Sequence, residues 1–158
     1  MTYEQALNKA AAWCSKAERA TRDVLDKLRV WEVSEADAAR IIQWLTDEGF
    51  LSEARYVHAF VNDKLTYDHW GRIKIRYALQ QKGVSPEQIA LAFDEQINEE
   101  QYLAVLVDLL KGKMRGMKLP LDRNDRAKLY RFAASRGFET AVCSQALQRM
   151  EVQEDNDE

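Results

Sequence analysis

Apolar residues recur every three or four positions along most of this chain, which is the spacing of one face of an α-helix. Two clear stripes are Ala38, Ile41, Ile42 and Leu45, and Tyr102, Val105, Leu106 and Leu109. Only two prolines and six glycines interrupt a sequence rich in helix-forming residues. The pattern predicts an all-α protein with helices near residues 3–14, 16–30, 35–48, 53–66, 71–82, 86–96, 99–114, 123–135 and 140–150.

Three helix ends resemble one another: LRVWEVS at 28–34, LQQKGVS at 79–85 and AASRGFE at 133–139. Each has an apolar residue after a turn position, which is occupied by Glu32, Gly83 and Gly137 in turn. A left-handed backbone at the end of a helix favours glycine, because a Cβ is costly there. We therefore expect positive φ at Gly83 and Gly137, and a differently closed turn at Glu32.

The recurring turns divide the chain into tandem units of three helices each. We expect three-helix repeats at 1–50, 51–97 and 98–150, followed by an acidic disordered tail at 151–158. The connection at 111–122 contains two glycines and a proline and is the expected hinge.

The segment from Trp70 to Gly83 carries two apolar strips instead of one. On a helical wheel Ile75 and Leu79 form the core-facing stripe, whereas Ile73 and Tyr77 fall almost opposite. Cations flank this second strip, at Arg72, Lys74 and Arg76. Either the second strip packs against a neighbouring repeat, as the middle helices of a solenoid do, or it faces a partner.

Charge is unevenly distributed along the chain, whose net charge is −3. Lys and Arg minus Asp and Glu gives 8 − 11 = −3 for residues 1–63, 14 − 9 = +5 for 64–136, and 1 − 6 = −5 for 137–158. The central excess predicts a local attraction for an anionic partner. The candidate partner-binding residues are Arg72, Lys74, Arg76, Lys82, Arg123, Arg126, Lys128 and Arg131.

Residue patterns typical of enzymes are missing from the sequence. The two histidines, His58 and His69, have no partner at a metal-binding spacing, and no glycine-rich phosphate loop occurs. We expect no catalysis, no metal and no cofactor. Cys14 and Cys143 lack a CxxC spacing, which indicates reduced thiols. Without a signal-like N-terminus or an apolar run long enough to cross a bilayer, we expect a cytoplasmic protein.

Two central segments, GFLSEARYVHAFVNDK at 49–64 and GRIKIRYALQQKGV at 71–84, resemble the RecX family of recombination regulators. The matching positions in the first segment are Gly49, Phe50, Leu51, Glu53, Arg55, Tyr56, Phe60, Val61 and Lys64. Those in the second segment are Gly71, Ile75, Leu79, Lys82 and Gly83. The likeness is strongest over residues 49–95, and the sequence departs from it at Glu32, where a glycine is expected.

The resemblance implies tandem three-helix repeats in an elongated, curved module. It also implies a partner, the RecA recombinase as a filament on single-stranded DNA, with the module in the filament's helical groove. The implied outcome is modulation, usually inhibition, of ATP hydrolysis and strand exchange in recombination and DNA repair. We expect a monomer with weak direct DNA contact and no membrane contact. Two alternatives stay open, a nucleic-acid-binding helical module and a general protein-interaction scaffold.

Overall fold

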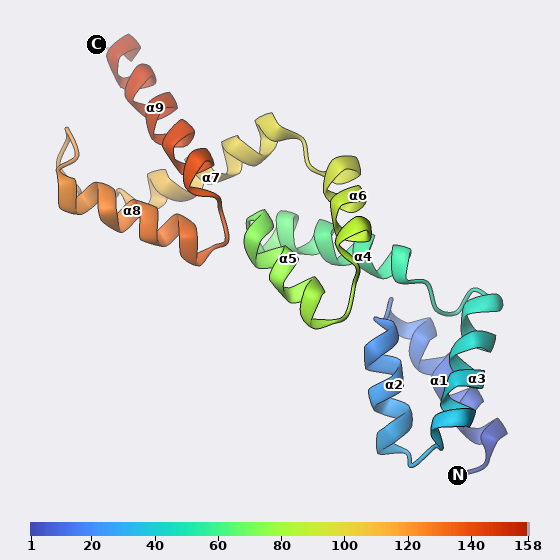
Figure 1. Ribbon diagram of the computed structural model, residues 1–158. Coiled ribbons are helices and arrows are strands. Elements are labelled where there is room, and N and C mark those ends of the chain that lie inside the picture. Colours follow the sequence, from blue (N-terminus) through green and yellow to red (C-terminus); the bar gives the residue numbers. More distant parts are fainter. Residues whose placement is uncertain (158) are drawn as a thin grey trace. The chain divides into compact units, whose positions relative to one another are not determined.

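The computed structural model describes the backbone of residues 1–157 and the side chains of residues 1–151. All regular elements in this described part are helices (Figure 1). They are α1 (Tyr3–Lys16), α2 (Thr21–Val30), α3 (Glu35–Asp47), α4 (Glu53–Asp63) with the π-helix η1 (Lys64–Asp68), α5 (Arg72–Gln81), α6 (Pro86–Gln96), α7 (Glu99–Lys113), α8 (Arg123–Ser135) and α9 (Thr140–Asp157). The predicted all-α class, with helices in successive groups of three, is confirmed.

The helices begin where short polar side chains can bind the free backbone N–H groups of a first turn. Ser34, Asn98 and Asp122 each accept a hydrogen bond from the N–H group three residues further along the chain. Thr2 and Gln5 form a reciprocal capping box at the start of α1. These contacts are local in sequence, and for this reason most helix boundaries lie within a few residues of their predicted positions.

Helix α2 begins later than the predicted residue 16, because the chain leaves the helical conformation after Lys16. Ala17 is extended, with φ −165° and ψ 159°. The guanidinium group of Arg19 donates to the carbonyl oxygen of Trp13 at 3.1 and 3.2 Å, which holds the connection against the end of α1. Since residues 16–30 consist largely of helix-forming types, their pattern alone does not show this break.

Helix α9 ends at Asp157 rather than at the predicted residue 150. It therefore continues through most of the segment for which we expected a disordered tail. The first four residues added, 151–154, include two glutamates and one glutamine, which are good helix formers and extend a helix that is already nucleated. The boundaries of the three repeats stay a prediction.

The three recurring turns share one conformation. Glu32, Gly83 and Gly137 have φ of 60°, 79° and 91°. In each turn the next N–H group donates to the carbonyl oxygen five residues earlier, at 2.9 Å (Val33 to Leu28), 3.1 Å (Val84 to Leu79) and 3.0 Å (Phe138 to Ala133). The prediction for the two glycines is confirmed, whereas the prediction of a different first turn is wrong. The strain of about 1 kcal/mol at a left-handed residue with a side chain is small enough to be offset by the same turn hydrogen bonds.

We expect Glu32→Gly to raise the free energy of unfolding by about 0.5 kcal/mol, because relief of left-handed strain outweighs the extra freedom of glycine in the unfolded chain. Urea denaturation followed by circular dichroism measures the effect. Glu48→Gly is the matched control, since Glu48 also ends a helix and is exposed but has φ −87°. It should lower stability, and a loss of stability in both variants would contradict the argument.

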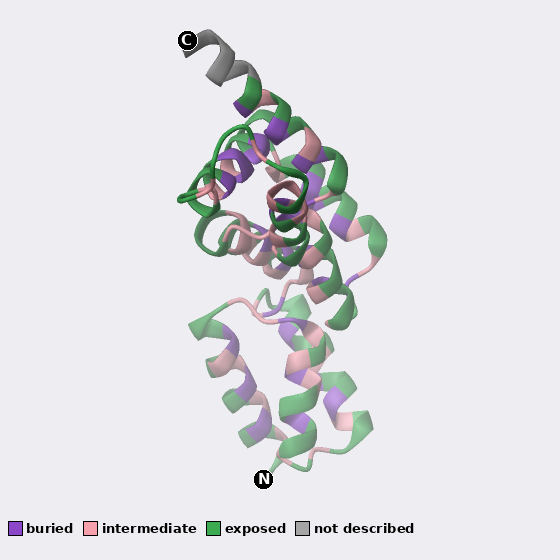
Figure 2. Cartoon of the chain, turned by 90° about the vertical axis from the view of Figure 1, so that its left-hand side faces the viewer, coloured by how far each residue is buried: buried purple, intermediate pink, exposed green. Residues whose placement is uncertain are grey.

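The chain divides into two compact units, residues 1–62 with 78–92, and residues 63–77 with 93–158. In the first unit α1, α2 and α3 enclose a core that includes Ala10, Leu28, Ile41 and Leu45. The core of the second unit lies among α7, α8 and α9 and includes Tyr102, Leu106, Leu129, Phe138 and Cys143. Figure 2 shows buried positions along the helices, as the spacing predicts. Within the described residues no helix has the length and hydrophobicity that a membrane span requires.

Candidate partner-binding site

The start of α5 is fixed by α7 and by the turn between α8 and α9. The N–H groups of Gly71 and Ile73 donate to the carbonyl oxygens of Arg136 and Gly137, at 2.7 and 2.9 Å. The N–H group of Arg72 donates to the hydroxyl oxygen of Tyr102 at 3.0 Å. Such N–H groups at the start of a helix have no partner within the helix. Here a segment far along the chain supplies the acceptors, so the first turn of α5 is held in place.

Two glycines allow this close approach. A Cβ on Gly137 would lie 2.4 Å from the Cβ of Lys74 and 2.6 Å from its backbone nitrogen. A Cβ on Gly71 would lie 2.4 Å from the carbonyl carbon of Gly137. All three distances are far shorter than van der Waals contact. Backbone therefore packs directly on backbone at the start of α5, and neither position has room for a side chain.

Arg72 is held by two carboxylates and an aromatic ring. Its Nη1 lies 2.6 Å from Oε1 of Glu99, and its Nε lies 2.7 Å from Oε2 of Glu139. Its guanidinium carbon lies 4.2 Å from the ring centroid of Tyr102, and the Tyr102 hydroxyl donates to Oε1 of Glu139 at 2.5 Å. The Arg72 side chain is only 16% exposed. Its partners are already supplied within this unit, so the geometry favours a structural role for Arg72.

Burial and hydrogen bonding shift the pKa values of this network. Burial raises the pKa of Tyr102, and its hydrogen bond to Glu139 raises it further. Burial opposes the charge of Glu139, but hydrogen bonds from Tyr102 and Arg72 outweigh it and lower the pKa of that carboxyl. Burial likewise opposes the charge of Arg72, and hydrogen bonds to Glu99 and Glu139 more than compensate, so its pKa is raised. The ionised pair is the stable form of the network at neutral pH.

We expect the network to make the protein sensitive to acid. Because the pKa of Glu139 is lowered by folding, its contribution to stability is complete above the pKa of the unfolded carboxyl and is lost as the pH falls through the folded value. Glu139→Gln should therefore be less stable than the parent chain at pH 7, with a difference that narrows toward pH 3. Urea denaturation at pH 3, 5 and 7 measures this, and a difference independent of pH would contradict it.

The other side of α5 is exposed. Ile73 and Tyr77 are 49% and 65% accessible, whereas Ile75 is fully buried. The interpretation that Ile73 and Tyr77 pack internally is therefore wrong. Lys74 Nζ lies 4.6 Å from the centroid of the Trp70 ring, and the guanidinium carbon of Arg76 lies 5.4 Å from that of the Phe93 ring. We name Ile73, Lys74, Arg76 and Tyr77 the α5 face.

The second and third repeats of the family are recognisable in the sequence. Residues 52–92 match the domain described as RecX, second three-helix domain, and residues 99–147 match RecX, third three-helix domain. The chain belongs to the RecX family. The two matches include α5 and all of the residues that hold Arg72.

Individual relatives agree with this assignment. The regulatory protein RecX of Clostridium beijerinckii is 29% identical over 140 residues, which is 85% of this chain and 63% of that protein. The regulatory protein RecX of Pseudomonas fluorescens strain SBW25 is 38% identical over 103 residues, which is 65% of this chain and 64% of that protein. The matches thus extend over somewhat less than two thirds of the length of these curated relatives.

Solved RecX structures share the fold. The crystal structure of RecX from Lactobacillus salivarius superposes with a TM-score of 0.86 at 20% identity, covering 95% of this chain and 97% of that one. A second structure, of a regulatory protein RecX, gives a TM-score of 0.83 at 20% identity and covers 92% and 71% of the two chains. This RecX chain therefore has the fold of the solved RecX structures.

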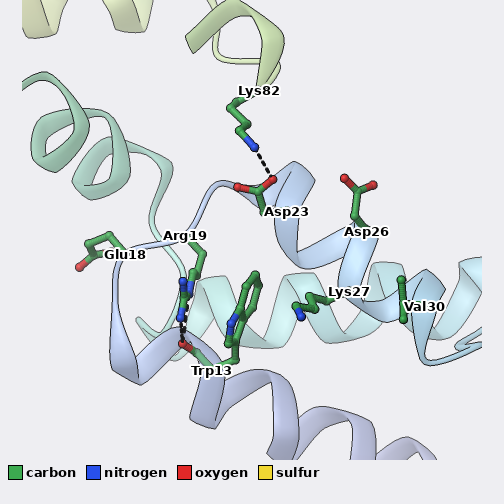
Figure 3. Close-up of a pocket in the computed structure, with 8 residues that line it drawn as sticks. All are labelled: Trp13, Glu18, Arg19, Asp23, Asp26, Lys27, Val30 and Lys82. Carbon is green, nitrogen blue, oxygen red and sulfur yellow. Dashed lines mark hydrogen bonds and ion pairs between the residues drawn. The ribbon is translucent and has the colours of Figure 1, made fainter. Parts of the chain in front are cut away.

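Lys82 belongs to the first compact unit, whereas the α5 face belongs to the second. Its Nζ contacts Oδ1 of Asp23 at 2.8 Å (Figure 3). It lines an open hollow of about 410 Å³ together with Trp13, whose ring stacks under the guanidinium group of Arg19 at 4.1 Å. An acidic neighbour in the same unit already compensates the charge of Lys82.

The cations predicted on α8 differ in their surroundings. Arg126 forms an ion pair with Glu151 of α9, with its Nη1 2.6 Å from the carboxylate oxygen. Arg123, Lys128 and Arg131 are exposed, and in the described part of the chain no ion pair is found for them. A partner-binding role for these residues stays a prediction.

Sequence reasoning missed the residues that hold α5. Tyr102 was assigned to an apolar stripe, and neither Glu99 nor Glu139 was considered a site residue. The hydrogen bonds of Arg72 to Glu99, Tyr102 and Glu139 join residues 27, 30 and 67 positions apart. No local pattern marks such pairs. Gly137 was the one sequence feature that pointed to this site, because a glycine there is needed both for the left-handed turn and for the close contact with Lys74.

Reactive side chains are sparse among residues 1–151, whose side chains are described. Cys14 and Cys143 are free and buried, and burial raises the pKa of both thiols. They are therefore poor nucleophiles at neutral pH. Among the side chains of residues 1–151, no group of three or more His, Cys, Asp or Glu is placed to hold a metal ion.

Proposed function

We propose that this chain binds the RecA recombinase filament on single-stranded DNA and inhibits its ATP hydrolysis and strand exchange. The observation that carries the proposal is the match of residues 52–92 and 99–147 to two RecX domains, together with relatives that are named regulatory proteins. The cationic α5 face, on a helix whose first turn is held by hydrogen bonds, supports it, because such a surface suits binding to an acidic protein partner.

A regulator that catalyses nothing acts only through its affinity for different states of its target. It shifts the filament toward whichever state it binds more tightly, and it can shift the equilibrium by no more than that difference in affinity. We propose that the chain binds tightest to a state of the filament in which ATP hydrolysis and strand exchange are slow.

A titration of the chain into RecA that hydrolyses ATP on single-stranded DNA tests the proposal. We expect the steady-state ATPase rate to fall and to reach a plateau as the added protein saturates the filament, and co-sedimentation to show the chain on the filament. A rising rate with co-sedimentation would retain RecA as the partner but overturn inhibition. Neither a change in rate nor co-sedimentation at saturating concentration would overturn the proposal.

Direct binding to single-stranded nucleic acid is the second candidate. Tyr67 and Tyr77 are 75% and 65% exposed in the same compact unit as Lys74 and Arg76, and exposed aromatic rings beside cations can stack on bases. With a net charge of −3, we nevertheless expect a Kd of about 1 μM or weaker at physiological salt. Fluorescence anisotropy with a labelled oligothymidylate measures it. Tight binding that resists salt would rank this candidate first.

A further inference from the structure

Ile73 and Tyr77 form an apolar pair of which about half or more of each side chain stays exposed. The two residues lie four positions apart on α5, so their side chains are neighbours on one side of the helix. They stay 49% and 65% exposed while Ile75, between them in sequence, is fully buried on the other side. Folding alone therefore gives no reason for apolar side chains at these two positions.

The first turn of the helix that carries this pair is held by hydrogen bonds from other segments. Three backbone N–H groups at its start have acceptors on the Arg136–Gly137 turn and on Tyr102. The Arg72 side chain is fixed by Glu99 and Glu139 on the other flank. A surface that is already ordered loses little conformational entropy on binding, which favours affinity. The first half of α5 is therefore prepared for docking before any partner arrives.

Charge on the α5 face indicates the chemistry of the partner. Lys74 and Arg76 contact the rings of Trp70 and Phe93, and within the described residues no ion pair is found for either cation. The nearby carboxylates of Glu99 and Glu139 are occupied by Arg72. The α5 face thus has an unbalanced positive charge on both sides of an apolar pair, and its complement is an apolar hollow with carboxylates at its edge.

We propose that the α5 face is a docking surface for protein, in which Ile73 and Tyr77 fill an apolar hollow and Arg76 pairs with a carboxylate at its edge. A central aromatic and aliphatic pair with an arginine beside it is typical of residues that dominate binding energy. Ile73 argues against nucleic acid as the occupant, because an aliphatic side chain offers no ring for a base to stack on. The proposal rests on the proposed function in taking the RecA filament as the protein that carries this hollow.

The test compares variants of the full chain for their binding to RecA filaments on single-stranded DNA. For Ile73→Ser combined with Tyr77→Ser, we expect the concentration for half-maximal filament binding to rise about tenfold or more, with an unchanged urea midpoint. Leu91→Ser is the matched control, since Leu91 is also apolar and 58% exposed but lies on α6. It should bind like the parent chain.

A second pair of variants keeps the test decisive if the double serine variant folds poorly. Arg76→Glu should lose filament binding whereas Arg76→Lys should largely retain it, because the edge of the hollow needs a positive charge. Parent chain that binds no filament overturns the proposed function. Parent chain that binds while all α5 variants bind equally well overturns the docking surface alone. Variants that lose affinity for a labelled oligothymidylate to the same degree would make the α5 face a nucleic-acid site, which also overturns the proposal.

Discussion

Replacing Gly137 by alanine is expected to lower the free energy of unfolding by about 2–4 kcal/mol, since left-handed strain and overpacking add at this position. Gly137 has φ +91°, and its new Cβ would lie 2.4 Å from the Cβ of Lys74 and 2.6 Å from its backbone nitrogen. Neither atom belongs to a flexible chain end, so α5 itself has to move. That movement also weakens the hydrogen bond from the Ile73 N–H to the Gly137 carbonyl oxygen.

Two other glycines serve as controls for this prediction. Gly83 has φ +79° in an equivalent turn, but a Cβ there meets the end of the Arg22 side chain, which can swing away. Gly83→Ala should therefore cost only about 1 kcal/mol. A Cβ on Gly112, in α7, meets nothing within 4 Å, and Gly112→Ala should raise stability by about 0.5 kcal/mol through helix propensity. Urea denaturation ranks the three variants, and equal costs at Gly137 and Gly83 would show that the contact with Lys74 yields easily.

The fold could be predicted from the sequence because the interactions that set the helix boundaries join residues close together in the chain. The capping side chains of Thr2, Ser34, Ser85 and Asn98 bind N–H groups three residues away, so a short window of sequence contains both partners. The turn at Glu32 was mispredicted because ordinary packing and hydrogen bonding can offset a local backbone strain of about 1 kcal/mol. The break before α2 was missed because it depends on an Arg19 side chain that folds back on Trp13.

Only about half of the candidate site could be predicted from the sequence. The helical wheel separates Ile75 and Leu79 from Ile73 and Tyr77, and the structure shows the first pair buried and the second exposed. The same wheel places Arg72 among exposed cations. Periodicity within one helix shows which side of the helix faces the nearest core, but it does not show which other side is covered by a segment distant in the sequence. In the structure the turn at 136–139 covers that flank of α5. Replacing all of the predicted cations by glutamate in one variant would therefore change the stability of the fold as well as partner binding, and the two effects could not be separated.

Arg72 is the residue at which these two effects separate most clearly. Removing one partner of a largely buried ion pair leaves the other charge without compensation, which costs about 3 kcal/mol at a well-buried site. Arg72→Met keeps much of the aliphatic stem over Tyr102 but leaves the Glu139 carboxylate, whose side chain is only 30% exposed, without a compensating positive charge. We expect a loss of about 2–3 kcal/mol in the free energy of unfolding, with Glu99 contributing little because it is 74% exposed and well hydrated.

Arg29 provides the matched control, because it also contacts two carboxylates, at 3.5 Å from Asp26 and 3.2 Å from Glu35, but is 56% exposed. Arg29→Met should cost less than about 1 kcal/mol, as exposed ion pairs do. A double-mutant cycle of Arg72→Met with Glu139→Gln measures the coupling directly in urea titrations. A coupling free energy no larger than that between Arg29→Met and Glu35→Gln would contradict a structural role for Arg72. When filament binding is measured at a temperature where each variant is folded, Arg72→Met should bind far better than Arg76→Glu, because Arg72 holds α5 in place, whereas Arg76 is the residue that we propose pairs with the partner.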